Sequence, residues 1–262
     1  AYLILLGISV TANWYVYRWM LRNRSRSLMI AAIAANLCAL GCFKYLALII
    51  ESSLWLARAA GVDVAVGRPG WIDWVLPLGI SFYTFHMLSA MIDVYRGDCV
   101  KEISYRHWCL FVTFFPQLIA GPIVRAVDFM PQIPERPRLD RAALDEALFR
   151  IMRGLIKKIV LADFIAQYAD AAYSAPGEAG FAGAWLGVYE FTFQVYFDFA
   201  GYSDIAIGSS RLIGFQLMEN FRNPYAAVSL TYYCRRWHIS LSSWFRDYLY
   251  VPLGGNRTPV RI

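Results

Sequence analysis

The sequence is poor in charged residues. Only 17% of its 262 residues are charged, whereas a soluble globular domain usually carries about a quarter. Hydrophobic residues make up 58% of the chain. This composition argues against an ordinary soluble domain and predicts a protein that is integrated in a membrane.

Histidine and cysteine are also scarce. The chain has three histidines and five cysteines. The odd number of cysteines, without CxxC spacing, argues against a disulfide framework, and the few histidines do not cluster as zinc ligands do. We therefore expect free thiols, no metal site and no bound cofactor.

The basic excess has a pattern of its own. The net charge is +6, and the basic residues lie in short clusters between apolar segments, as in cytoplasmic loops that contact anionic lipid headgroups. This pattern predicts membrane lipids as partners and argues against nucleic-acid binding.

Four apolar segments are long enough, or nearly so, to cross a bilayer. They cover residues 2–19, 28–50, 74–93 and 181–199. Arginines follow the first segment, which places that loop in the cytoplasm by the positive-inside rule. We expect an all-α, polytopic integral membrane helix bundle in which residues 1–262 form a single membrane domain.

Several of the predicted helices are interrupted or amphipathic. Pro116 and Pro122 break the segment 107–124, which predicts a re-entrant loop, and such broken helices would form a central funnel. Residues 140–170 are predicted to form an amphipathic helix with Asp140 as its N-cap.

The stretch from Arg236 to Pro252 has helical spacing of its aromatic residues and no internal proline or glycine, which predicts one continuous helix. It contains His238. An ionisable group within a membrane segment usually lines a cavity or a reaction path. The alternative is a histidine whose hydrogen bonds are satisfied inside the bundle.

Four stretches resemble one known family. They are PLGISFYTFHMLSAMIDVYRG at 77–97, FFPQLIAGPIVRAVDFMPQI at 114–133, YFDFAGYSDIAIGSSRLIGFQLMENFRNPY at 196–225 and RRWHISLSSWFRDYLYVPLGGNR at 235–257. Together they are similar to the membrane-bound O-acyltransferase family, in particular its bacterial branch that acetylates exopolysaccharides such as alginate. In that family a second histidine, the usual candidate for the general base, follows in a later hydrophobic segment. We therefore expect this chain to be the N-terminal and central part of a longer protein, without its C-terminal part.

The resemblance implies an O-acetyltransferase of the bacterial inner membrane. It would take an acyl group, in particular acetyl, from a cytoplasmic thioester donor, either acetyl-CoA or an acyl carrier. The acceptor would be the hydroxyls of an extracytoplasmic polysaccharide such as alginate, reached directly or through a periplasmic acetyltransferase partner. His238 would lie in the active site, as a general base, an orienting group or a group that polarises the thioester carbonyl.

Within these stretches the candidates for substrate binding are Gln117, Trp237, Ser242, Arg246 and Asp198. Structural roles remain open, because Gln117 could instead shape the re-entrant wall and Arg246 could fix the helix end with Asp247. Asp198 and Asp204 could instead pair with an arginine such as Arg235, Arg236 or Arg246.

Two rival functions remain. A transporter or flippase is the first, because Glu190, Gln194 and Asp198 are spaced by four residues and form a polar stripe predicted to face the bundle interior. The second is an inactive fragment of the acyltransferase.

Overall fold

The computed structural model describes residues 2–62, 77–98, 101–133, 139–175, 177 and 180–257. All regular secondary structure in these ranges is helical, which confirms the predicted all-α class. The chain divides into two compact units, Ala1–Thr113 and Phe114–Ile262. The single membrane domain over residues 1–262 stays a prediction.

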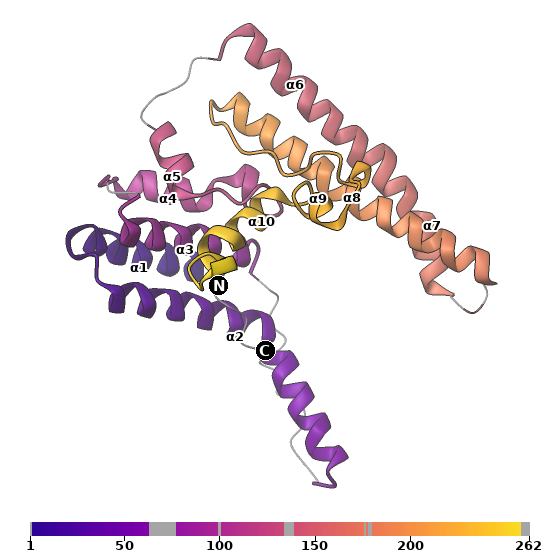
Figure 1. Ribbon diagram of the computed structural model, residues 1–262, viewed down its shortest axis with the longest axis horizontal. Helices are drawn as coiled ribbons and strands as arrows, with labels where there is room; N and C mark the ends of the chain where they lie inside the picture. The colour runs from indigo at the N-terminus through magenta and orange to yellow at the C-terminus, as the bar shows by residue number, and fades with distance from the viewer. Residues whose placement is uncertain are drawn as a thin grey trace. The chain divides into compact units, whose positions relative to one another are not determined.

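The described residues of the first unit form four helices, drawn from indigo to magenta in Figure 1. They are α1 (Tyr2–Asn23), α2 (Arg26–Ala59), α3 (Ile80–Arg96) and α4 (Tyr105–Thr113). The buried Trp108 ties α4 to α1, because its indole nitrogen donates to the carbonyl of Val10 at 2.9 Å. The third predicted segment is helical from Ile80 onward, whereas its predicted start at Trp74 lies outside the described residues.

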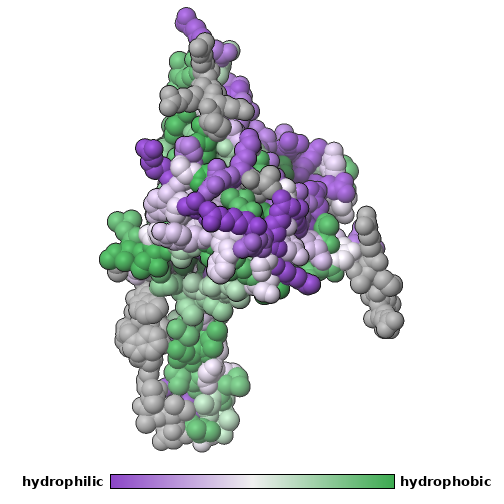
Figure 2. Space-filling view, turned by 90° about the vertical axis from the view of Figure 1, so that its left-hand side faces the viewer, coloured by the Kyte–Doolittle hydropathy of each residue, from purple (hydrophilic) through white to green (hydrophobic). Residues whose placement is uncertain are grey.

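Helix α2 is the one described helix that is long and apolar enough to cross a membrane by length and composition. Only 6% of its apolar window is buried against the rest of the protein, so α2 is not a core helix of its unit. Figure 2 shows hydrophobic residues covering its extended C-terminal half, in the lower part of the view. A membrane would remove this apolar surface from water. The further predicted spans stay predictions.

The second unit is built around a pair of long helical segments. On one side, α6 (Arg141–Leu155), a π-helical segment (Ile156–Ala162) and α7 (Asp163–Ser174) follow one another without a break. The predicted N-cap is confirmed, since the carboxylate of Asp140 accepts a hydrogen bond from the backbone N–H of Ala143 at 2.7 Å. The other side is α8 (Gly180–Leu212), which runs antiparallel to them.

Two glycines allow this pair of helices to pack closely. A Cβ at Gly154 of α6 would lie 2.7 Å from the carbonyl oxygen of Gly201 in α8, and a Cβ at Gly201 would lie 2.8 Å from that of Gly154. Such backbone contacts are typical of helix packing in membranes, where small residues let backbones approach. The basic residues on one face of α6 are thereby brought against α8.

The remaining elements of this unit are short. They are η2 (Phe115–Gln117), α5 (Ala126–Phe129), η3 (Met130–Gln132), η5 (Pro224–Ala226), α9 (Leu230–Cys234), α10 (Ile239–Phe245), the π-helical η6 (Arg246–Tyr250) and η7 (Gly255–Arg257). The prediction of one continuous helix from Arg236 to Pro252 is therefore wrong in its extent. The observed helix begins only after His238, because the backbone of His238 is left-handed with φ 43° and does not continue a right-handed helix.

The break predicted within residues 107–124 is present. Helix α4 ends at Thr113, and the next helical turn, η2, contains Pro116 and ends at Gln117. Whether this segment enters and leaves the membrane on one side, as the re-entrant hypothesis requires, stays a prediction.

A candidate active site around His238

His238 has a strained backbone. It precedes α10 with φ 43° and ψ 54°, in the left-handed region. Within the described part of the chain only His238 and Asn223 have a positive φ without being glycine. For an L-residue this conformation costs roughly 1–2 kcal/mol, and residues held in it cluster at functional sites. The strain therefore marks His238 as a functional candidate independently of its family motif.

The imidazole of His238 is held by Asn220. Its Nδ1 lies 2.9 Å from Oδ1 of Asn220, a side chain that is only 1% exposed. The same amide oxygen accepts from the hydroxyl of Ser240 at 2.9 Å and from its backbone N–H at 3.3 Å. The amide nitrogen of Asn220 donates to Oγ of Ser203 in α8 at 3.1 Å.

Two backbone hydrogen bonds fix the strained turn against the segment that follows α8. The N–H of Ile239 donates to the carbonyl of Asn220 at 2.9 Å, and the N–H of Arg222 donates to the carbonyl of Arg236 at 3.0 Å. Because these bonds bracket His238, the turn cannot relax to an ordinary conformation without breaking them.

Aromatic rings surround this turn. The ring of Phe199 in α8 meets the imidazole edge-on, at 4.7 Å between centroids and 80° between planes. Trp237 stacks on Tyr233 at 5.7 Å and stands perpendicular to Phe221 at 5.1 Å. Trp237 thus packs in an aromatic cluster beside the histidine.

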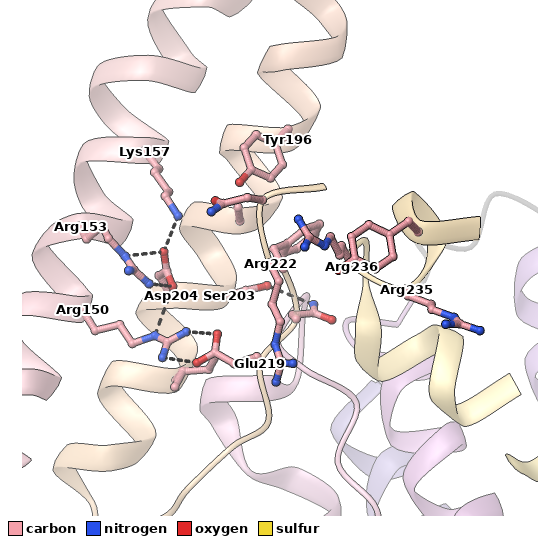
Figure 3. Close-up of a pocket in the computed structure, with 16 residues that line it drawn as sticks. Arg150, Arg153, Lys157, Tyr196, Ser203, Asp204, Glu219, Arg222, Arg235 and Arg236 are labelled. Carbon is pink, nitrogen blue, oxygen red and sulfur yellow. Dashed lines mark hydrogen bonds and ion pairs between the residues drawn. The ribbon is translucent and has the colours of Figure 1, made fainter. Parts of the chain in front are cut away.

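A cavity of about 630 Å³ adjoins this site, and Figure 3 shows it. Asn220, the residue that holds His238, is part of its wall. Six basic residues line the cavity against two carboxylates, Asp204 and Glu219. The basic residues are Arg150, Arg153, Lys157, Arg222, Arg235 and Arg236.

Asp204 binds three of these cations at once. Arg153 donates to its two carboxylate oxygens at 2.6 and 3.1 Å, Lys157 donates at 2.7 Å, and Arg150 at 3.2 Å, as the dashed lines in Figure 3 mark. Burial alone would raise the pKa of Asp204, but the hydrogen bonds from Arg153 and Lys157 outweigh burial and lower it. Asp204 is therefore a fixed anion that orders the cations of α6 and the π-helical segment.

Glu219 completes the ion network. Both nitrogens of the Arg150 guanidinium fork donate to its two carboxylate oxygens. Burial would lower the pKa of Arg150, but the hydrogen bond and charge of Glu219 raise it. Arg150 therefore remains a cation that joins α6, α8 and the segment after α8.

The other three arginines of the cavity have no carboxylate partner within the described residues. Arg236 lies over the ring of Tyr232, with its guanidinium carbon 4.2 Å from the ring centroid. Arg222 and Arg235 are exposed. Guanidinium groups with free donors favour phosphate and carboxylate ligands, so the cavity is suited to an anion.

A second cavity, of about 860 Å³, has Ser242 and Arg246 in its wall. Arg235 lines both cavities. Arg246 donates to the carboxylate of its neighbour Asp247 at 2.7 and 3.1 Å, and Asp247 also pairs with Arg125 at 2.8 Å. Ser242 and Arg246 thus share the wall of this second cavity, whereas Trp237 packs in the aromatic cluster next to His238.

Two other predicted residues lie elsewhere. Asp198 is paired with Lys158 at 2.7 Å, and its side chain is 52% exposed. Asp198 therefore forms an ion pair with the π-helical segment next to α8, apart from His238. Whether the stripe of Glu190, Gln194 and Asp198 faces the interior of the bundle stays a prediction. Gln117 is fully buried in η2 and is not among the residues that line either cavity.

Ion pairing was the right structural alternative for both aspartates, but the predicted partners were wrong. Asp204 pairs with Arg150, Arg153 and Lys157, and Asp198 pairs with Lys158, rather than with the arginines near His238. The spacing of the α6 cations was visible in the sequence, although nothing in it showed that they face α8. Asn220, Ser203 and Ser240 carried no recognisable signal.

The chain belongs to the membrane-bound O-acyltransferase family. The model of this family matches residues 100–260, which include every residue of the site described above.

The most similar relatives include proteins named as probable alginate O-acetylase AlgI. That of Azotobacter vinelandii is 46% identical over 226 residues, covering 86% of this chain and 44% of the relative. That of Pseudomonas aeruginosa is 40% identical over 260 residues, covering 97% of this chain and 49% of the relative. The peptidoglycan O-acetyltransferase of Helicobacter pylori is 33% identical over 288 residues, covering 98% and 53%. The chain thus spans about half the length of these curated relatives.

Proposed function

We propose that the protein to which this chain belongs is an O-acetyltransferase of the bacterial inner membrane, with several membrane spans. It transfers acetyl from a cytoplasmic thioester to hydroxyls of an extracytoplasmic polysaccharide such as alginate. The observation that carries this proposal is the strained, half-buried His238, whose imidazole is held by Asn220, a residue in the wall of a cation-rich cavity.

The charge of the cavity supports a free coenzyme thioester as the donor. Six basic residues against two carboxylates favour a ligand with several negative charges. Acetyl-CoA, with a diphosphate and a further phosphate, carries such charges, whereas a prosthetic group on a carrier protein carries a single phosphodiester. The proposed phosphate ligands are the three arginines that have no carboxylate partner in the described part of the chain, namely Arg222, Arg235 and Arg236.

The transfer requires a group that accepts a proton. As the hydroxyl oxygen of the acceptor attacks the thioester carbonyl, the imidazole of His238 takes the hydroxyl proton and a C–O bond forms. The C–S bond then breaks, and the departing sulfur takes the proton from the imidazolium. The products are an acetyl ester and a free thiol, and the histidine returns to its neutral form.

The relatives support a polysaccharide acceptor. Those named as alginate O-acetylases are 40–46% identical to this chain, whereas two named as teichoic acid D-alanyltransferases are 34% and 30% identical. We propose that the acetyl group reaches the polymer directly or through a periplasmic acetyltransferase. The ion pair of Asp198 with Lys158 gives this carboxylate a structural partner, which weighs against its use in a transport path.

The test uses the full-length protein in membrane vesicles, with acetyl-CoA whose acetyl group is labelled and a soluble polysaccharide acceptor. With the wild-type protein the labelled acetyl group should be transferred to the acceptor, and with His238→Ala the rate of transfer should fall to background. The exposed His107 provides the matched control, and His107→Ala should retain the wild-type rate. Equal rates for the two histidine variants would refute the proposed site, and flux of unmodified substrate without transfer would favour the transporter.

A further inference from the structure

Asn220 has a chemical role that its position alone does not reveal. An amide oxygen can accept hydrogen bonds but cannot donate them. Because Oδ1 of Asn220 lies 2.9 Å from Nδ1 of His238, the hydrogen bond between them requires that Nδ1 carry the proton. The amide nitrogen of Asn220 donates to the hydroxyl of Ser203 at 3.1 Å.

Ser240 fixes the orientation of this amide. Its backbone N–H and its hydroxyl both donate to the same Asn220 oxygen, at 3.3 and 2.9 Å. A reversed amide would place its N–H₂ group against the Ser240 N–H, so two donors would face each other without an acceptor. Since Asn220 and Ser240 are both buried, such a mismatch would cost about 1–3 kcal/mol.

We propose that Asn220 is a positioning residue that holds neutral His238 as the Nδ1–H tautomer, so that Nε2 is the proton acceptor in acyl transfer. This inference rests on the proposed function for the transfer step. It selects one of the roles that the sequence left open. A neutral imidazole in this tautomer cannot donate a hydrogen bond from Nε2 to a thioester carbonyl, but it can accept the proton of a hydroxyl.

The strained turn belongs to the same arrangement. His238 and Ser240 lie on either side of Ile239, whose backbone N–H donates to the carbonyl of Asn220. The left-handed backbone at His238 lets the side chains of His238 and Ser240 both reach Oδ1 of Asn220. The backbone N–H of Ile239 meanwhile keeps its hydrogen bond to the carbonyl of Asn220. The cost of the strained backbone is thus offset by hydrogen bonds that specify the tautomer.

The first measurement reads the tautomer directly. The full-length protein is labelled with ¹⁵N-histidine, and the imidazole nitrogens of His238 are identified by the signals that disappear in His238→Ala. At a pH where the ring is neutral, the wild type should show a protonated Nδ1 and a bare Nε2. In Asn220→Leu, which has a similar volume but no acceptor, the two tautomers should mix. A protonated Nε2 in the wild type, or an unchanged tautomer in Asn220→Leu, would overturn the inference.

The second measurement asks whether the tautomer matters for transfer. Asn220→Leu should lower kcat by about a hundredfold or more, the size expected for general-base catalysis, with little change in KM for the thioester. Asn220→Asp keeps the acceptor oxygen and should recover most of kcat. The groups that contact the imidazole, namely Asn220, Ser240 and Phe199, are uncharged. The new carboxylate should therefore stabilise the imidazolium and move the acid limb of the pH profile to higher pH.

A control separates tautomer control from general damage to a buried site. Asn36 is also a buried asparagine and is paired with Asn13 at 2.8 Å, far along the chain from His238. Asn36→Leu should leave both the tautomer and the pH profile unchanged, even if it lowers stability. If Asn220→Asp instead leaves the pH profile unchanged, Asn220 is only structural.

The two hypotheses fail in different ways. If His238→Ala keeps transferring acetyl, the proposed active site is wrong whatever the tautomer. If His238→Ala is inactive but Asn220→Leu retains wild-type kcat, the active site stands and the positioning role of Asn220 is refuted.

Discussion

The left-handed backbone at His238 predicts a particular order of stability among its variants. His238→Gly should be more stable than His238→Ala, although both lose the imidazole and its hydrogen bond to Asn220. For a residue that has a Cβ, a φ of 43° costs roughly 1–2 kcal/mol, whereas glycine adopts this conformation freely. Glycine also has more conformational freedom in the unfolded chain, which reduces its stability advantage by about 0.4–1 kcal/mol. The expected net difference in the free energy of unfolding is about 1 kcal/mol in favour of glycine.

The assay compares thermal unfolding of the two variants of the full-length protein, purified in the same detergent. A difference of about 1 kcal/mol corresponds to roughly 2–4 °C for a domain of this size. Ser243 in α10 is the matched control, because its helical backbone should reverse the order and make Ser243→Ala more stable than Ser243→Gly. An alanine variant at 238 that unfolds at the same or a higher temperature than the glycine variant would refute the strain argument.

Three further predictions concern the surroundings of the site. Asp204→Asn should destabilise the protein by about 3 kcal/mol, because Arg153 and Lys157 lose their anion and Arg150 keeps only Glu219. The folded pKa of Asp204 is lowered, so its contribution to stability is complete above the unfolded pKa and is lost as the pH falls through the folded pKa. Acid titration of stability should therefore be steeper in the wild type than in Asp204→Asn. Gly154→Ala should cost about 1–3 kcal/mol in a denaturation assay because its Cβ meets the Gly201 backbone, whereas Gly41→Ala, with open space around it, should not destabilise. Arg236→Ala should raise KM for acetyl-CoA by about tenfold through loss of one charged contact, and an unchanged KM would remove Arg236 from the donor site.

The sequence predicted the helical class and several local features. The Asp140 cap and the chain break at Pro116 follow from rules that involve only a few neighbouring residues. The family motif around His238 also identified the segment in which the candidate active site lies.

What failed were inferences that depended on tertiary partners. The helix expected across His238 is interrupted because hydrogen bonds to Asn220, eighteen residues earlier, stabilise a left-handed backbone that no local propensity favours. Asp198 was expected to pair with an arginine near His238, yet Lys158 of the π-helical segment pairs with it. The partners of Asp204 lie 47–54 residues away on another element, so their pairing could not be read from spacing.

The acetate content of the polymer tests the account most directly. Cells that depend on the full-length protein for acetylation would carry either the wild type or His238→Gln, which keeps a polar side chain of similar size but cannot accept a proton as imidazole does. With equal amounts of both proteins in the membrane, the account predicts that the polysaccharide from the variant carries no ester-linked acetate. Wild-type acetate in that polysaccharide would contradict the assignment of His238 to acyl transfer.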